Sequence, residues 1–151
     1  KLLTNFSGHQ DDNALSKRVA LAQIAAGADI IFPMLNAGRD GVTEACREKG
    51  ARQISNVIDW VSVEPKVFVA SAIADVSIGV FNAVRDLRDG RFRTGVVHKV
   101  GLADPAAVRL SMADDVPAAV RSRVEAAADN IRGGRLRVPE NYEGPEFATP
   151  S

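Results

Sequence analysis

The sequence is poor in the residues that usually carry covalent or metal chemistry. It contains one cysteine, Cys46, and two histidines, His9 and His98, which lie far apart in the chain. A single cysteine excludes an internal disulfide framework and any cysteine-based metal cluster, and the two histidines lack the spacing of a zinc site. Cys46 follows Val42 by four residues, on the expected buried face of a helix, so we interpret it as a small core residue.

The chain also lacks a net charge and a long apolar run. Its 19 basic residues balance 19 acidic ones, so the composition does not suggest a nucleic-acid partner. No apolar run reaches about 18 residues and no signal peptide is apparent, so no membrane-spanning segment is expected. The sequence starts at Lys1 without an initiator methionine, and we expect it to be a part of a longer protein.

The common catalytic signatures are missing as well. The sequence has no G-x-S-x-G elbow, no P-loop, no H-E-x-x-H motif and no G-x-G-x-x-G after a strand. The stretch NAGRDG at residues 36–41 spaces two glycines three apart, which is only a weak phosphate-binding signal. We therefore expect a protein that is not an enzyme, with no catalytic residues, metal or cofactor.

Short apolar runs instead alternate with segments of helical periodicity. The apolar runs predict strands at residues 2–6, 29–35, 51–58, 66–73 and 94–100. Apolar residues at helical spacing predict helices at residues 15–27, 42–50, 76–87 and 117–131, with Asp75 capping the third and glycine ending the second and fourth. This alternation predicts an α/β fold with a mostly parallel sheet flanked by helices and right-handed crossovers.

Domain organisation follows from the same pattern. Residues 1–138 are expected to form one α/β lobe, and residues 139–151, with three prolines and few apolar residues, an extended tail. In such sheets ligands bind outside the carboxyl ends of the strands. The loops at that edge are residues 7–12, 35–40, 56–60 and 71–77.

Polar and aromatic side chains in these loops are candidates for ligand binding. They can hydrogen-bond a polar ligand and stack on a flat one. Each has a structural alternative: the turn residues can simply satisfy local geometry, the acid can be a solvated loop residue, and the tryptophan can pack at a hinge. The candidates are Asn36, Ala37, Gly38, Asn56, Asp59 and Trp60.

Four sequence blocks in order resemble one family. GADIIF at residues 27–32 is followed by G-V-x-E-A at 41–45 and EKG at 48–50, and the next block, 54–60, stands where the family has I-G-V-D-S-D-Q. Upstream, Gly8 with DDNA at 11–14 and Lys17, and downstream, FNAV at 81–84 with DGRF at 89–92, also match. The sequence is similar to the basic membrane lipoprotein family, the purine-nucleoside receptors of ABC importers.

The resemblance implies a fold, a function and partners. It implies one Rossmann-like lobe of a type I periplasmic-binding-protein fold, the C-terminal half of a two-lobed receptor that binds a small polar, nucleoside-like ligand between its lobes. The partners implied are the ligand, a missing N-terminal lobe and an ABC permease, without nucleic acid, at an extracytoplasmic, periplasmic or lipid-anchored location. Phe32 matches a strand-end aromatic that would stack on the base, with core packing as the alternative.

The sequence departs from the family at polar positions of the expected site. Val57 stands where the first Asp of V-D-S-D-Q is typical, Trp60 replaces the Gln, and Ala103 replaces a Lys. Ser77 stands where family members have an Asp that binds ribose, and it can still donate or accept a hydrogen bond. The open alternatives are the ligand-sensing lobe of a transcription regulator and, with less support, an enzyme on a flavodoxin-like fold.

Overall fold

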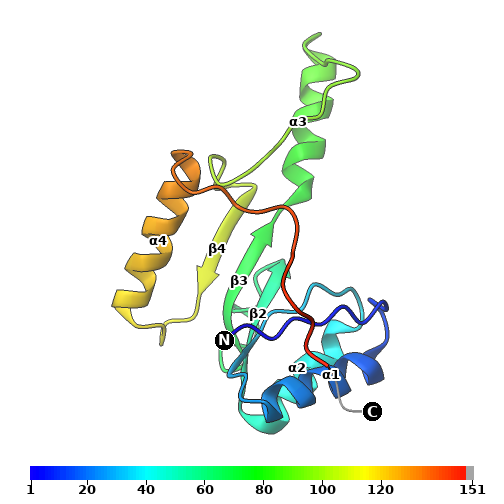
Figure 1. Cartoon of the computed structure of the whole chain (residues 1–151). Coiled ribbons are helices and arrows are strands. Elements are labelled where there is room, and N and C mark those ends of the chain that lie inside the picture. The colour runs from blue at the N-terminus through cyan, green and yellow to red at the C-terminus, as the bar shows by residue number, and fades with distance from the viewer. Residues whose placement is uncertain (149–151) are drawn as a thin grey trace.

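The computed structural model describes residues 1–148 and contains one four-stranded sheet and four helices (Figure 1). The strands are β1 (Ile30–Ile31), β2 (Arg52–Val57), β3 (Phe68–Ala74) and β4 (Val108–Met112), which lie side by side in that order. The first three run parallel, and β4 runs antiparallel to β3. The predicted α/β class with a mostly parallel sheet is confirmed.

All four expected helices are present, with ends set by local sequence. They are α1 (Asn13–Ala25), α2 (Arg39–Lys49), α3 (Val76–Arg88) and α4 (Ala118–Arg132). The Asp12 carboxylate accepts a 2.9 Å bond from the Leu15 amide at the start of α1, and Asp75 caps α3 in the same manner through Ser77. Gly50 ends α2 with a φ of 68°, a left-handed conformation that favours glycine.

The core lies between the sheet and the pair formed by α1 and α2. Its buried apolar residues come from both helices, from β1 and β3 and from connecting segments, whereas the buried residues of β2 are polar, Gln53 and Ser55. Two buried serines in this layer are paired: the Ser55 hydroxyl donates to Ser71 Oγ at 2.7 Å, and Ser71 Oγ accepts the Val61 amide at 3.1 Å. Ser71 thereby fixes the connection between β2 and β3 against the middle of β3.

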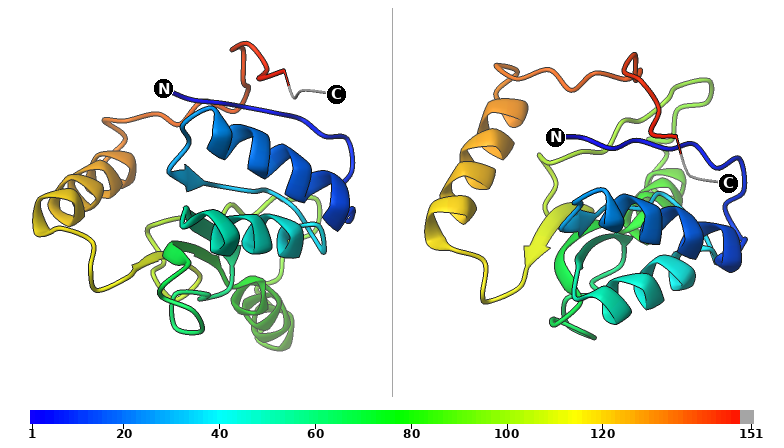
Figure 2. Two further views of the ribbon diagram at one scale, coloured as in Figure 1. Left: turned by 90° about the horizontal axis from the view of Figure 1, so that it is seen from below. Right: turned by 60° about the horizontal axis from the view of Figure 1, so that its bottom comes forward.

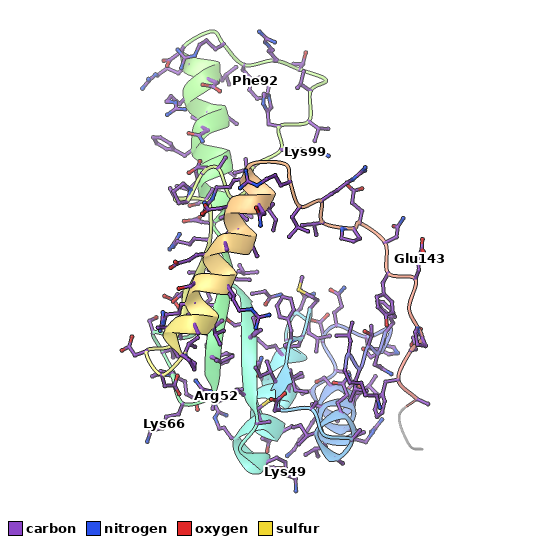
Figure 3. The ribbon with its side chains drawn as sticks, turned by 60° about the vertical axis from the view of Figure 1, so that its left-hand side comes forward. Lys49, Arg52, Lys66, Phe92, Lys99 and Glu143 are labelled. Carbon is purple, nitrogen blue, oxygen red and sulfur yellow. The ribbon has the colours of Figure 1, made fainter. Side chains whose placement is uncertain are left out.

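The other two helices stand apart from this core. Neither α3 nor α4 contains a buried residue. Figure 1 shows α3 projecting beyond the end of β3, with α4 standing on the far side of β4. In Figure 3 the loop that follows α3, marked by Phe92 and Lys99, lies at the opposite end of the molecule from Lys49 and Lys66. The chain is therefore a packed α/β unit from which α3 extends.

Three strand predictions need correction. Residues 2–6 form only an isolated bridge, between Thr4 and Glu146, and the predicted strand 29–35 is reduced to Ile30–Ile31. Proline at position 33 has no N–H to donate to a ladder, which accounts for the early end of β1. Residues 94–100 form no strand and are exposed throughout. The strand that pairs with β3 is instead β4, which the sequence analysis missed.

The beginning and the end of the described chain run side by side across α1 (Figure 2). The Phe147 amide donates to the Thr4 carbonyl at 2.6 Å, and Asn5 Nδ2 donates to the Phe147 carbonyl at 3.0 Å. The rings of Phe6 and Tyr142 lie 6.0 Å apart. Residues 139–148 contain bends and the bridge at Glu146 but no helix or strand, and positions 149–151 of the predicted tail lie outside the described residues.

Candidate functional site

The carboxyl ends of β1, β2 and β3 meet at one edge of the sheet because these strands are parallel. Phe32 follows β1 directly, Asn56 is the last but one residue of β2 and Asp59 comes two residues after that strand, and Ser77 is the second residue of the helix after β3. The structure thus brings the predicted site residues to a common edge. A shallow depression lined by residues 8–12 adjoins the turn after β1.

The turn NAGRDG docks onto the segment that starts α1. The amides of Asn36 and Gly38 both donate to the Gln10 carbonyl at 3.0 Å, and the Ala37 amide donates to Asp11 Oδ1 at 3.2 Å. The Gly41 amide donates to the side-chain oxygen of the first residue of α1 at 2.9 Å. These amides already have partners within the protein, so the turn does not form the open amide cradle that binds phosphate.

Both glycines of the turn permit this close approach. A Cβ atom on Gly38 would lie 2.8 Å from the Gln10 carbonyl oxygen, and one on Gly41 would lie 2.1 Å from the Asn13 carbonyl oxygen. The Ser16 hydroxyl donates to the carbonyl of Gly38 across the same contact. The glycine spacing is therefore explained by packing between α1 and α2.

Three polar candidates are engaged in local hydrogen bonds. Asp59 Oδ1 accepts the Ser62 amide at 3.4 Å, and Asn56 Nδ2 lies 3.5 Å from the sulfur of Met34. The Ser77 hydroxyl donates to Asp75 Oδ1 at 2.5 Å. That hydroxyl and then the Ser77 amide hold the pKa of the Asp75 carboxyl below its usual value. By contrast, Asn36 has an exposed side chain with no hydrogen bond to any residue of the described chain.

Trp60 is held between other side chains. The Arg39 guanidinium carbon lies 4.2 Å from the centre of the Trp60 ring, a cation–π contact. Phe68 lies on its core side, with ring centres 5.6 Å apart and planes inclined by 32°. The indole Nε1 is buried and has no partner within residues 1–148. Arg39 is a residue of this edge that the sequence analysis did not single out.

An apolar surface occupies the same edge, and sequence reasoning missed most of it. We call this surface the strand-end patch. It consists of Phe32, Met34, Val57 and Ile58, whose exposed fractions are 52%, 66%, 51% and 52%. The contact between Asn56 and Met34 shows that the segment after β1 continues alongside β2 with the register of Ile31 and Gln53. A signal was present in the sequence, because all four are apolar residues at the carboxyl ends of the first two strands or just beyond them.

Val57 has an unusual backbone conformation. Its φ is 72°, and it is the only residue other than glycine with positive φ in the described part of the chain. A β-branched residue is rare in this left-handed region, where the steric penalty is roughly 1–2 kcal/mol. Such outliers concentrate at functional sites, because the surrounding structure holds them in place. The strained backbone of Val57 therefore makes the end of β2 a candidate functional position.

The chemical groups at this edge suit binding better than bond making. Within residues 1–148 no three His, Cys, Asp or Glu side chains converge in a way that could hold a metal ion. Cys46 is fully buried among apolar residues, and this burial raises the pKa of its thiol to about 11. What the edge offers is exposed apolar surface, one free amide side chain and backbone groups.

In open α/β sheets of this kind, ligands bind at the carboxyl edge, where these groups lie. The family model for PnrA-like substrate-binding proteins of ABC transporters matches residues 1–140. The chain therefore belongs to this family of transport proteins, which is not a family of enzymes. Comparison with the curated proteins gives no significant match. No helix of the described residues is long and apolar enough to cross a bilayer.

Solved structures support the same fold. A transcriptional activator of the comK gene from Bacillus halodurans has a TM-score of 0.75 at 17% identity, over 83% of this chain and 44% of that one. A solute-binding protein of an ABC transporter system from Aeropyrum pernix K1 has a TM-score of 0.71 at 19% identity, over 92% and 48%. One from Conexibacter woesei DSM 14684 has a TM-score of 0.63 at 22% identity, over 89% and 45%. The chain spans less than half the length of each.

Proposed function

We propose that this chain is the C-terminal lobe of the solute-binding component of an ABC importer. In the proposal, the lobe closes with an N-terminal lobe on a small, nucleoside-like ligand, without chemical turnover, and the closed receptor docks on a membrane permease outside the cytoplasm. The observation that supports it is the family match over residues 1–140 together with the gathering of the candidate residues at one sheet edge. Periplasmic and lipid-anchored forms are both compatible with this role.

The surface of α3 supports the presence of a second lobe. Its exposed residues Val76, Val80, Val84 and Leu87 recur at helical spacing and form one apolar stripe. An apolar helix face of this size is usually packed against another element. In the proposal, the N-terminal lobe covers it. Val80→Glu should then lower the melting temperature of the full-length receptor and leave that of the 151-residue chain unchanged, as judged by differential scanning calorimetry.

The direct test is calorimetric titration of the full-length receptor with a panel of nucleosides and nucleobases. Binding of at least one compound at micromolar or tighter Kd supports the proposal, since the ligand of such a receptor is enclosed between two lobes. The 151-residue chain, which supplies only one wall, should bind the same compound at least tenfold more weakly. Equal affinity of the two proteins would contradict the two-lobed site.

Asp59 is the predicted acid at the ligand edge. In the full-length receptor, Asp59→Ala should weaken ligand binding, and because its carboxylate also accepts the Ser62 amide, the variant should lose about 0.5–1 kcal/mol of stability. Ser62→Ala removes the bond from its hydroxyl to the Asp59 carbonyl and serves as the control for local turn stability. If both variants bind equally well, Asp59 is not a ligand contact.

A second function is favoured by one structural neighbour. The activator from Bacillus halodurans shares the fold, so the lobe also suits the ligand-sensing part of a transcription regulator. A regulator would carry a DNA-binding segment elsewhere in its gene product. Retardation of promoter DNA by the full-length protein in gel electrophoresis would favour this alternative. Recovery of an unchanged ligand from denatured protein would separate either binding role from an enzyme.

A further inference from the structure

The residues that are free to meet a ligand at the carboxyl edge are mainly apolar. Of the predicted polar contacts, Asp59 accepts the Ser62 amide, Asn56 faces the Met34 sulfur, and Ser77 is bonded to its helix cap. The face of the Trp60 ring that could receive a flat ligand is occupied by the Arg39 guanidinium. Each of these groups thus has at least one contact within the protein, whereas the buried Trp60 indole Nε1 has no partner among residues 1–148.

The strand-end patch occupies the positions between these engaged groups. Phe32 and Met34 follow β1, Val57 is the last residue of the neighbouring parallel strand β2, and Ile58 follows it. All four side chains are about half exposed or more, although apolar residues of this size are usually buried. An apolar patch at a family's ligand edge presents ring faces, a thioether and methyl groups, which suit a flat heterocycle and offer nothing to a sugar hydroxyl.

The backbone at Val57 is independent support for a role in function. Its φ of 72° places a branched side chain in a conformation suited to glycine, asparagine or aspartate. A residue of those types would relieve the strain, yet the chain holds an exposed valine there. The conformation projects an apolar side chain at the edge, where a carboxylate would have offered hydrogen bonds.

We propose that the ligand is a flat, uncharged heteroaromatic compound without a ribose, such as a free nucleobase, received by the strand-end patch. This inference rests on the proposed function and narrows its ligand class. Phe32 stacks on the ring or packs against its edge, Met34, Val57 and Ile58 cover its apolar surface, and the free Asn36 amide supplies a hydrogen bond to a ring nitrogen or carbonyl. A ribose would bury its hydroxyl groups against the patch without partners, which is unfavourable.

The test is calorimetric titration of the full-length receptor with adenine and adenosine. Adenine should bind at least tenfold more tightly than adenosine. Equal or tighter binding of adenosine would overturn the inference and leave the proposed nucleoside-receptor function intact. If the receptor binds neither compound, the inference is overturned. The proposed receptor function is then decided by the wider panel of nucleosides and nucleobases described above.

Two variants test whether the strand-end patch causes the preference for adenine over adenosine. Val57→Asp introduces a residue type that tolerates positive φ and adds a hydrogen-bond acceptor, so the ratio of adenine to adenosine affinity should fall at least tenfold. Val63→Asp is the matched control, because Val63 is also exposed but adjoins Glu64, which pairs with Arg47 at the end of α2. A ratio that is unchanged in Val57→Asp, or that falls equally in Val63→Asp, would show that the patch does not select the ligand.

Discussion

The close contact between α1 and α2 can be tested by comparing the same substitution at two glycines. Gly41 lies in the first turn of α2, where an added Cβ would meet the Asn13 carbonyl oxygen at 2.1 Å and the Ser16 hydroxyl at 2.8 Å. Gly79 lies inside α3, where an added Cβ would meet nothing within 4 Å. Both residues are helical and neither has positive φ, so Gly41→Ala and Gly79→Ala make the same chemical change in opposite surroundings.

The expected magnitudes have opposite signs. Replacing glycine by alanine inside a helix stabilises it by roughly 0.5–1 kcal/mol, and Gly79→Ala should show this gain in full. At Gly41 the gain is at most about 1 kcal/mol, whereas the overlap forces backbone of α1 to move, and overpacking typically costs about 1–3 kcal/mol and sometimes more. We expect Gly41→Ala to destabilise by about 2 kcal/mol. At roughly 2–4 °C per kcal/mol for a chain of 151 residues, the melting temperature falls by about 4–8 °C.

Differential scanning calorimetry of the 151-residue chain and the two variants measures both shifts. Gly79→Ala should raise the melting temperature by about 1–4 °C, since the gain is not opposed by any contact. If Gly41→Ala raised the melting temperature as Gly79→Ala does, the two helices would not approach as closely as described, and the explanation of the glycine spacing by packing would be wrong.

Three further predictions concern single side chains. Val57→Asn should stabilise the chain by about 1 kcal/mol in chemical denaturation, because asparagine tolerates the left-handed conformation; no gain would contradict the strain. Ser71→Ala leaves the Val61 amide and a serine hydroxyl without a partner and should destabilise by about 2–4 kcal/mol, whereas Ser111→Ala on the adjacent strand should change stability little. Cys46 should resist iodoacetamide at pH 8 until the chain is unfolded, because burial raises its thiol pKa to about 11. The contribution of the neutral thiol to stability is complete below about pH 9 and is lost as the pH rises towards 11. Rapid alkylation of the native chain would contradict the burial of Cys46.

The elements that were predicted correctly carry strong and local signals. β3 is an apolar run of high β propensity, and α3 has both its cap, Asp75, and its apolar stripe in the sequence. The signal of β2 is weaker, since four of its six residues, RQISNV, are polar. Residues 94–100 have equal β propensity but no adjacent strand, and propensity expresses the fit to a half-buried sheet, which is absent there. β4 was missed although Val108–Met112 alternates apolar and polar residues, the pattern of a half-buried strand.

The location of the candidate site could be predicted from the sequence. Which of its side chains are free and which are engaged in contacts within the protein could not. The rule for parallel sheets places Phe32 and Asp59 at one edge from the order of the elements alone. Whether the Asp59 carboxylate is free depends on a turn that brings the Ser62 amide to it, and the covering of Trp60 depends on the direction of Arg39. The positive φ of Val57 has no sequence signal, since valine is among the residues least expected there.

The two ends of the sheet differ in their contacts because β4 is antiparallel to β3. The carboxyl ends of β1 and β2 carry the strand-end patch, and the opposite end carries charged contacts between connecting segments. Because β4 runs the opposite way, its end lies beside the start of β3, where Met112 pairs with Ala70. Beyond that end, Asp115 binds Arg52 at the start of β2 at 2.8 Å, and Arg52 also donates to the Pro65 carbonyl at 2.8 Å. These charged contacts join the connecting segments at the edge opposite to the strand-end patch. Ligand preference can therefore change by substitution at one edge while the other keeps the segments in register, and a library randomised over the patch should yield mostly folded receptors with altered specificity.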